Sequence, residues 1–139
     1  MMRRIKSAGL ALASLAILSS CSTLDSITSA GRVRGTYELS TVNGYQVPAM
    51  VYQEPGYRLD VLSAAFTLED DGTYSEAGIV RETINGQSTT RSTSSYGYYD
   101  YYNGEITFDE SGGRRYYGTL DGTTLVVEDQ GVRMVYRRY

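Results

Sequence analysis

The stretch YDYYNGEITF, residues 99–108, predicts a tight β-hairpin. Its central Asn-Gly pair is the strongest short-range hairpin signal, because both turn residues must accept a positive φ. Residues that lie directly opposite each other in an antiparallel pair share one face of the sheet. The turn therefore pairs Tyr99 with Phe108 and Tyr101 with Ile106, and it places these four apolar side chains on a single face.

The hairpins that follow along the chain extend this apolar face. Turns are expected at residues 111–113, 121–122 and 130–131, and the second of them pairs Gly118 with Leu125. A shift of one residue in any of these pairings would turn the apolar side chains to the opposite face. The predicted apolar face consists of Tyr99, Tyr101, Ile106, Phe108, Tyr116, Gly118, Leu120, Leu125, Val127, Met134 and Tyr136.

Turn dipeptides divide the whole domain into short runs rich in Tyr, Thr, Val, Ile and Leu, which is typical of an all-β sandwich or barrel. Eight strands are expected near residues 35–42, 57–69, 73–84, 87–102, 105–110, 114–120, 123–129 and 132–138. They predict a small eight-stranded antiparallel up-and-down barrel, closed by the first strand against the last. Residues 87–95 are almost all Ser, Thr and Arg, so this segment is predicted to belong to a long hairpin that reaches beyond the core.

Residues 1–20 have the pattern of a secretory signal peptide. A basic start precedes an uncharged apolar stretch, which is too short to span a bilayer because spanning takes roughly 20 apolar residues. The stretch ends in Leu18-Ser19-Ser20-Cys21, which resembles the bacterial lipobox.

This resemblance implies a lipoprotein in which Cys21 is acylated, for example with palmitate, and anchors the chain to a membrane. Residues 21–34 are then a lipidated tether and residues 35–139 the folded domain. Because Ser22 rather than Asp follows the cysteine, the expected location is the cell envelope, at the periplasmic face of the outer membrane.

Composition argues against several classes of function. The chain has no His, and Cys21 is its only cysteine, which removes the common zinc ligands, the Ser-His-Asp triad and a free cysteine nucleophile. We therefore expect no enzyme activity, no metal and no cofactor. Loss of Arg3, Arg4 and Lys6 with the signal peptide leaves 10 basic and 16 acidic residues, a net charge of −6. A chain this acidic is not expected to bind nucleic acid.

The start and the end of the domain resemble those of lipocalins. Gly35-Thr36-Tyr37 opens the first strand where lipocalins have Gly-x-Trp, and Arg137-Arg138 lies where lipocalins have an arginine that packs on this aromatic ring. Together with Asp71-Gly72-Thr73-Tyr74 and the hairpin at residues 99–108, these motifs are similar to those of small bacterial lipocalin-like domains. The resemblance implies a barrel that binds a small molecule, and it implies no catalytic residues.

The first functional hypothesis is a barrel that binds a small apolar or amphipathic molecule. Eight strands enclose an interior wide enough for side chains or for one small ligand, and Gly118 is expected to leave space there. The long connection at residues 43–56 is expected to fold over the barrel mouth as a lid. The candidate ligand-binding residues of the interior and the lid are Tyr37, Leu39, Met50, Tyr52, Phe66, Leu68, Tyr74, Tyr99, Tyr101, Phe108, Tyr116, Gly118, Leu125, Met134 and Tyr136.

The alternative hypothesis is an envelope interaction or scaffold module, for example a protein inhibitor, in which side chains fill the barrel and no ligand binds. Tyr96, Tyr98 and Tyr102 alternate along their strand with residues that face inward, so their side chains are expected to face outward. Exposed tyrosines form binding patches in some proteins and stabilising cross-strand pairs in others. The expected partners are the membrane, through acylated Cys21, and a small ligand or a protein; the chain itself is expected to be a monomer.

Overall fold

A computed structural model gives the structure of the protein and describes residues 33–139. The predicted signal peptide, Cys21 and most of the predicted tether lie outside the described residues, so the expectations about them stay predictions. The described chain forms the strands β1 (Gly35–Val42), β2 (Tyr45–Gln46), β3 (Ala49–Glu54), β4 (Tyr57–Leu68), β5 (Thr73–Ile84), β6 (Gln87–Tyr102), β7 (Glu105–Glu110), β8 (Arg115–Asp121), β9 (Thr124–Asp129) and β10 (Val132–Arg137).

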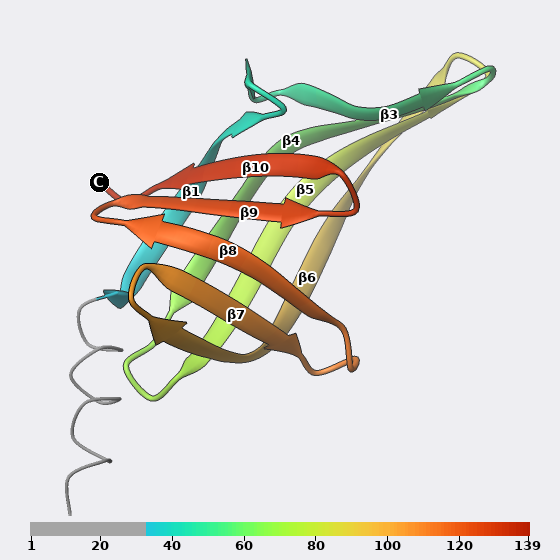
Figure 1. Ribbon diagram of the computed structural model, residues 1–139. Coiled ribbons are helices and arrows are strands. Elements are labelled where there is room, and N and C mark those ends of the chain that lie inside the picture. Colours follow the sequence, from blue (N-terminus) through green and yellow to red (C-terminus); the bar gives the residue numbers. More distant parts are fainter. Residues whose placement is uncertain (1–32) are drawn as a thin grey trace, which may run out of the picture.

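Eight of these strands close into an antiparallel up-and-down barrel. From β4 to β10 each strand pairs with the next one along the chain, and β1 closes the ring by pairing with β10 on one side and with β4 on the other. Figure 1 shows β7 to β10 crossing in front of β1, β4, β5 and β6. The predicted barrel and its closure are confirmed, and the ends of all eight predicted strands lie within one residue of the observed ends.

The turns set the registers of the hairpins as their chemistry predicts. Tyr101 lies opposite Ile106, and Tyr99 lies opposite Phe108. Both residues of the turn between them have positive φ, 50° at Asn103 and 87° at Gly104. This backbone matches the right-handed twist of the flanking strands, which is why Asn-Gly pins the register so firmly.

One predicted register is wrong, at the hairpin between β8 and β9. Gly118 lies opposite Val127 and not opposite Leu125, because the two turn residues are Gly122 and Thr123 instead of Asp121 and Gly122. Of the turn residues, only Gly122 has a positive φ, 57°, as in turns that need glycine at their first central position. The resulting offset is two residues, so every side chain keeps its predicted face.

The connection at residues 43–56, which was expected to fold over the barrel mouth as a lid, meets this expectation only in part: Val47, Ala49 and Val51 pack against the core. It contains β2, which pairs with the end of β1, and β3, which pairs with the first half of β4. A turn at Pro55-Gly56 joins β3 to β4, with a φ of 79° at Gly56. The connection is therefore built mainly from strands at the rim of the sheet, and Pro48 precedes the edge strand β3, where a missing N–H is tolerated.

A four-stranded arm, in which β3, β4, β5 and β6 pair in that order, extends from one end of the barrel, at the upper right of Figure 1. It consists of β3 together with residues 57–63 of β4, 79–84 of β5 and 87–95 of β6. β1 pairs with β4 only as far as Ala65, and β7 pairs with β6 only from Gly97 onward, so the strands of the arm continue beyond the barrel wall. The predicted long hairpin at residues 87–95 is thus present.

The opposite end of the barrel is closed by residues that precede β1. Val33, expected to lie in the tether, is buried, and its carbonyl accepts a hydrogen bond of 2.6 Å from the Tyr37 hydroxyl. The Arg138 guanidinium lies over the Tyr37 ring, 5.3 Å from its centroid. This is the contact that the lipocalin resemblance implies. The folded domain therefore includes Val33, two residues before the expected boundary.

Candidate functional site

The barrel interior, predicted as a ligand site, is filled by packed aromatic rings. The Phe66 ring centroid lies 5.0 Å from that of Phe108 and 4.9 Å from that of Tyr136. Phe108 in turn stacks on Tyr116 at 5.0 Å and meets Tyr74 edge-on at 5.0 Å. These spacings are those of rings in direct contact, so side chains occupy the space where a ligand would have to lie.

Most of the predicted interior residues come together in this core. Those that are buried are Tyr37, Leu39, Phe66, Leu68, Tyr74, Tyr99, Phe108, Tyr116, Leu125 and Tyr136. Tyr101 and Met134 are half-buried and pack against the same cluster. The two predicted lid residues do not join it: the exposed fractions of Met50 and Tyr52 are 45% and 50%.

Gly118 does not leave the interior space that was expected. A Cβ at this position would lie 2.5 Å from the carbonyl oxygen of Val126 and 3.2 Å from the Ile106 side chain. The glycine therefore allows a close approach to the backbone of β9, which a side chain at this position would obstruct. The same holds at Gly97, where a Cβ would overlap the carbonyl of Asp109.

A polar cluster lies inside the barrel toward the arm. Glu76 on β5 accepts hydrogen bonds from the Tyr136 hydroxyl at 3.1 Å and from the Ser95 hydroxyl at 3.2 Å. Beside it, the Tyr116 hydroxyl donates to the Tyr74 hydroxyl at 3.1 Å. Burial raises the pKa of the Glu76 carboxyl above its ordinary value of about 4.5, and the two hydroxyl donors oppose this only in part.

No cation hydrogen-bonds to the Glu76 carboxylate within the described chain, although an arginine lies nearby. Arg114 covers the Tyr116 ring at 5.0 Å, and its guanidinium bonds to Glu110 at 2.8 Å and Asp129 at 2.7 Å instead. Glu76 is not among the residues predicted from the sequence to belong to the site. The signal was available in the hairpin register, which places Glu76 opposite the inward residue Phe66.

Glu76 predicts a specific dependence of stability on pH. Its pKa is raised in the folded state, so the folded protein holds a proton at pH values where the unfolded chain has released it. Stability contributed by this group therefore falls as the pH rises from about 4.5 through the folded-state pKa. In Glu76→Gln this loss is absent, so we expect the variant to gain stability relative to the wild type between acidic and neutral pH.

The measurement is the difference in free energy of unfolding between Glu76→Gln and the wild type, from denaturant titrations at a series of pH values. Comparing the two proteins cancels the opposite contributions of Asp60, Asp71 and Glu82, whose pKa values are lowered in the folded state. A difference that stays constant with pH would show that the Glu76 carboxyl titrates as it does in the unfolded chain.

The outer surface of β6 and β8 carries a group of exposed tyrosines, here named the tyrosine face. The exposed fractions are 66% for Tyr96, 69% for Tyr98, 82% for Tyr102 and 61% for Tyr117. The outward parity predicted for the three tyrosines of β6 is thus confirmed. Tyr117 was missed, although its parity is opposite to that of its buried neighbour Tyr116.

A shallow groove of about 630 Å³ adjoins the tyrosine face on the outside of β7 to β10. The Tyr117 ring lines one part of it, and Glu105, Glu128 and Arg133 supply charged groups. Gly118 also lines the groove. It therefore combines an exposed aromatic side chain with both signs of charge, a composition suited to a protein partner.

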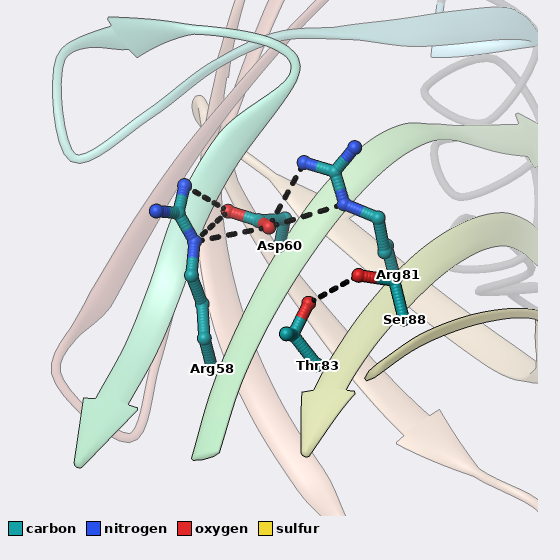
Figure 2. Close-up of polar contacts among 5 residues, drawn as sticks. All are labelled: Arg58, Asp60, Arg81, Thr83 and Ser88. Atoms are coloured by element: carbon teal, nitrogen blue, oxygen red, sulfur yellow. Dashed lines mark hydrogen bonds and ion pairs between the residues drawn. The ribbon is translucent and has the colours of Figure 1, made fainter. Parts of the chain in front are cut away.

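The arm carries an ionic cluster on its outer face, shown in Figure 2. Asp60 is buried beneath the guanidinium groups of Arg58 and Arg81, which bond to its carboxylate at 2.7 Å and 3.0 Å. These hydrogen bonds, chiefly the one from Arg58, hold the pKa of Asp60 below its ordinary value of about 3.8. Thr83 and Ser88 share a hydrogen bond of 2.8 Å next to it. The cluster links β4 to β5 and has the arrangement of a structural ion pair.

No family model matches the sequence, and no curated protein matches it. Within residues 33–139, no helix is long and apolar enough to cross a membrane, and no group of three acidic, His or Cys side chains is placed to hold a metal ion.

Proposed function

We propose that this chain is a membrane-anchored lipoprotein of the cell envelope that works as a protein-interaction module, with its lipocalin-like barrel as a filled scaffold. The observation that carries the proposal is the division of the aromatic side chains. Phe66, Phe108 and Tyr136 fill the barrel axis, whereas Tyr98, Tyr102 and Tyr117 stand exposed on its outside. The proposed activity is binding and not catalysis, and the proposed location is the periplasmic face of the outer membrane.

The tyrosine face is the surface proposed to contact the partner. Tyrosine offers a large contact area at a low cost in side-chain entropy and carries a hydroxyl for hydrogen bonds, which is why it is enriched at binding hot spots. Thr107 on β7 lies opposite Asp100 on β6 and opposite Tyr117 on β8. Tyr117 is therefore level with Asp100, at a height along the strands that lies between Tyr98 and Tyr102.

The anchor is tested at Cys21. Metabolic labelling with a fatty-acid analogue is expected to mark the wild-type protein and not the Cys21→Ala variant, because only the thiol accepts the lipid. The Cys21→Ala protein is also expected to leave the membrane fraction. Equal labelling of the two proteins would remove the anchor from the proposed function.

The interaction surface is tested by site-specific photo-cross-linking in cells. A photoreactive amino acid at Tyr102 is expected to give one discrete heterologous product, and the product is expected to disappear when Tyr98 and Tyr117 are changed to Ser. The matched control is the same probe at Tyr139, which is also exposed but lies at the C-terminus. Identical products from both positions would mean that the tyrosine face has no specific partner.

A second candidate function, binding of a small amphipathic molecule, is favoured by the Glu76 cluster. Its carboxyl and the Tyr136 hydroxyl offer an acceptor and a donor next to apolar walls, provided that rings of the core move aside. Native mass spectrometry of the full chain extracted in detergent distinguishes the two functions. The filled scaffold predicts the mass of the acylated polypeptide alone, whereas a stoichiometric additional mass would favour the small-molecule function.

A further inference from the structure

The arm has two free edges, and only one of them is protected against pairing with another strand. Within residues 33–139, no strand pairs with the outer edge of β3 or with the far edge of β6 along residues 87–95. β3 is short, follows Pro48, contains a bulge between Met50 and Tyr52, and ends in Glu54. Short length, proline, bulges and charge are the devices that keep edge strands from associating.

The edge of β6 has none of these devices except one charge. Its register with β5 runs from Gln87 to Tyr98 without a bulge, and the segment contains no proline. Arg91 is its only charged residue, and that guanidinium already bonds to Glu82 at 3.1 Å. A long, regular and nearly uncharged edge is a template for adding a further strand.

The backbone groups offered by this edge follow from two hydrogen bonds. The N–H of Tyr99 donates to the carbonyl of Gly72 on the β5 side, and the carbonyl of Tyr96 accepts from Ser111 on the β7 side. Backbone groups of successive residues alternate between the two sides of a strand. The residues that turn their N–H and C=O groups to the free edge are therefore Ser88, Thr90, Ser92 and Ser94.

We propose that this edge pairs with the same edge of a second copy of the chain, antiparallel and with Thr90 opposite Thr90 of the second copy. The arms then form one continuous sheet in which the two β6 strands lie at the centre. In this register Ser88 and Ser92 exchange hydrogen bonds with Ser92 and Ser88 of the second copy, and the two Thr90 residues exchange hydrogen bonds with each other.

Charge and the occupied carbonyl of Tyr96 favour this register over those centred on Arg91 and Ser92. With Thr90 at the centre, Arg91 lies opposite Thr89 of the second copy, and Thr89 is itself paired with Glu82. Each Arg91 is thus placed between the carboxylates of two Glu82 residues. A register centred on Arg91 would place the two Arg91 side chains opposite each other, and like charges in that position are destabilising. A register centred on Ser92 would pair Ser88 with Tyr96, whose carbonyl already accepts a hydrogen bond from the N–H of Ser111.

Cysteine cross-linking in membranes of cells expressing the full chain tests the register. Thr90→Cys is expected to give a disulfide-linked dimer on oxidation, because the two Thr90 residues face each other across the two-fold axis. The matched control is Ser94→Cys, which has the same outward parity on the same strand. In the proposed register the two copies of residue 94 lie about 27 Å apart along the strand, so no dimer is expected.

A second pair of variants tests the edge without a cysteine. Thr90→Pro removes a backbone N–H that points away from β5, so the hydrogen bonds between β5 and β6 are kept. Thr90→Ala keeps this N–H and serves as the matched control. In sedimentation of the detergent-solubilised full chain, we expect Thr90→Pro to weaken dimerisation at least about tenfold, and Thr90→Ala to change it by less than about threefold.

A monomeric wild type, equal behaviour of Thr90→Pro and Thr90→Ala, or equal cross-linking at positions 90 and 94 would overturn the proposal. A disulfide that joins the Thr90→Cys variant to a different protein would show that the strand pairing with this edge comes from another protein and not from a second copy of the chain. The test is independent of the tyrosine face, because β6 carries the two surfaces on different segments.

Discussion

Deleting residues 132–139 is expected to abolish the folded barrel. β10 is the strand that closes the ring, since it pairs with β9 from Val132 to Arg137 and with the second half of β1. Its removal leaves two long unpaired edges and withdraws Tyr136, which is fully buried against Phe66. It also removes Arg138 from the Tyr37 ring at the closed end. Unpaired edges next to an opened apolar core lead to aggregation.

The measurement is the far-UV circular dichroism and the size distribution of the truncated chain, compared with a chain that lacks only Tyr139. Tyr139 is almost fully exposed and lies outside β10, so the control deletion is expected to keep the fold and the melting temperature. A chain without residues 132–139 that stays monomeric and melts like the wild type would show that barrel closure contributes nothing to stability.

Phe108→Ala is expected to reduce the free energy of unfolding by about 3–5 kcal/mol. The Phe108 side chain is fully buried, and its ring centroid lies 5.0 Å from those of Phe66, Tyr74 and Tyr116. Removing it leaves a cavity lined by three rings that belong to three different strands. Because those rings are held by the barrel wall, they cannot all move in to fill the space.

Denaturant titration of Phe108→Ala and of Thr119→Ala provides the comparison. Thr119 is exposed on the adjacent strand β8, and its replacement is expected to cost no more than about 1 kcal/mol, the range of strand propensities. A loss below about 1 kcal/mol for Phe108→Ala would mean that the centre of the barrel is a solvated pocket, and it would favour the small-molecule function over the filled scaffold.

The sequence predicts the barrel well because its information about strands and turns is local. Asn-Gly at residues 103–104 sets one register through backbone conformation alone, and alternation then places Tyr99 and Phe108 on the same face. Even the wrong register at Gly118 kept the correct faces, because a turn displaced by one residue along the chain shifts the pairing by two. Local turn chemistry together with a period of two was thus enough to identify the core.

The functional surfaces could be predicted only where they follow from the same alternation. Alternation along the strand identified Tyr98 and Tyr102 as outward-facing. Applied to every strand, it would also have identified Tyr117 as outward-facing and Glu76 as inward-facing. It could not show whether the inward rings leave a cavity, because that depends on how side chains from opposite walls meet. Gly118 illustrates the limit: a missing side chain indicates free space in a sequence, but here the Val126 backbone occupies that space.

The sequence by itself determined the eight barrel strands, their order and the apolar face of the hairpins from β6 to β10. Only the tertiary structure decided where neighbouring strands separate: β1 leaves β4 after Glu38, β7 joins β6 at Gly97, and the freed segments with β3 form the arm. The physical reason is that hydrogen-bonded turns and alternating side chains are encoded within a few residues. Closure of a barrel, its filling by rings from opposite walls and the free edge that closure leaves at residues 87–95 depend on contacts between segments far apart in the chain.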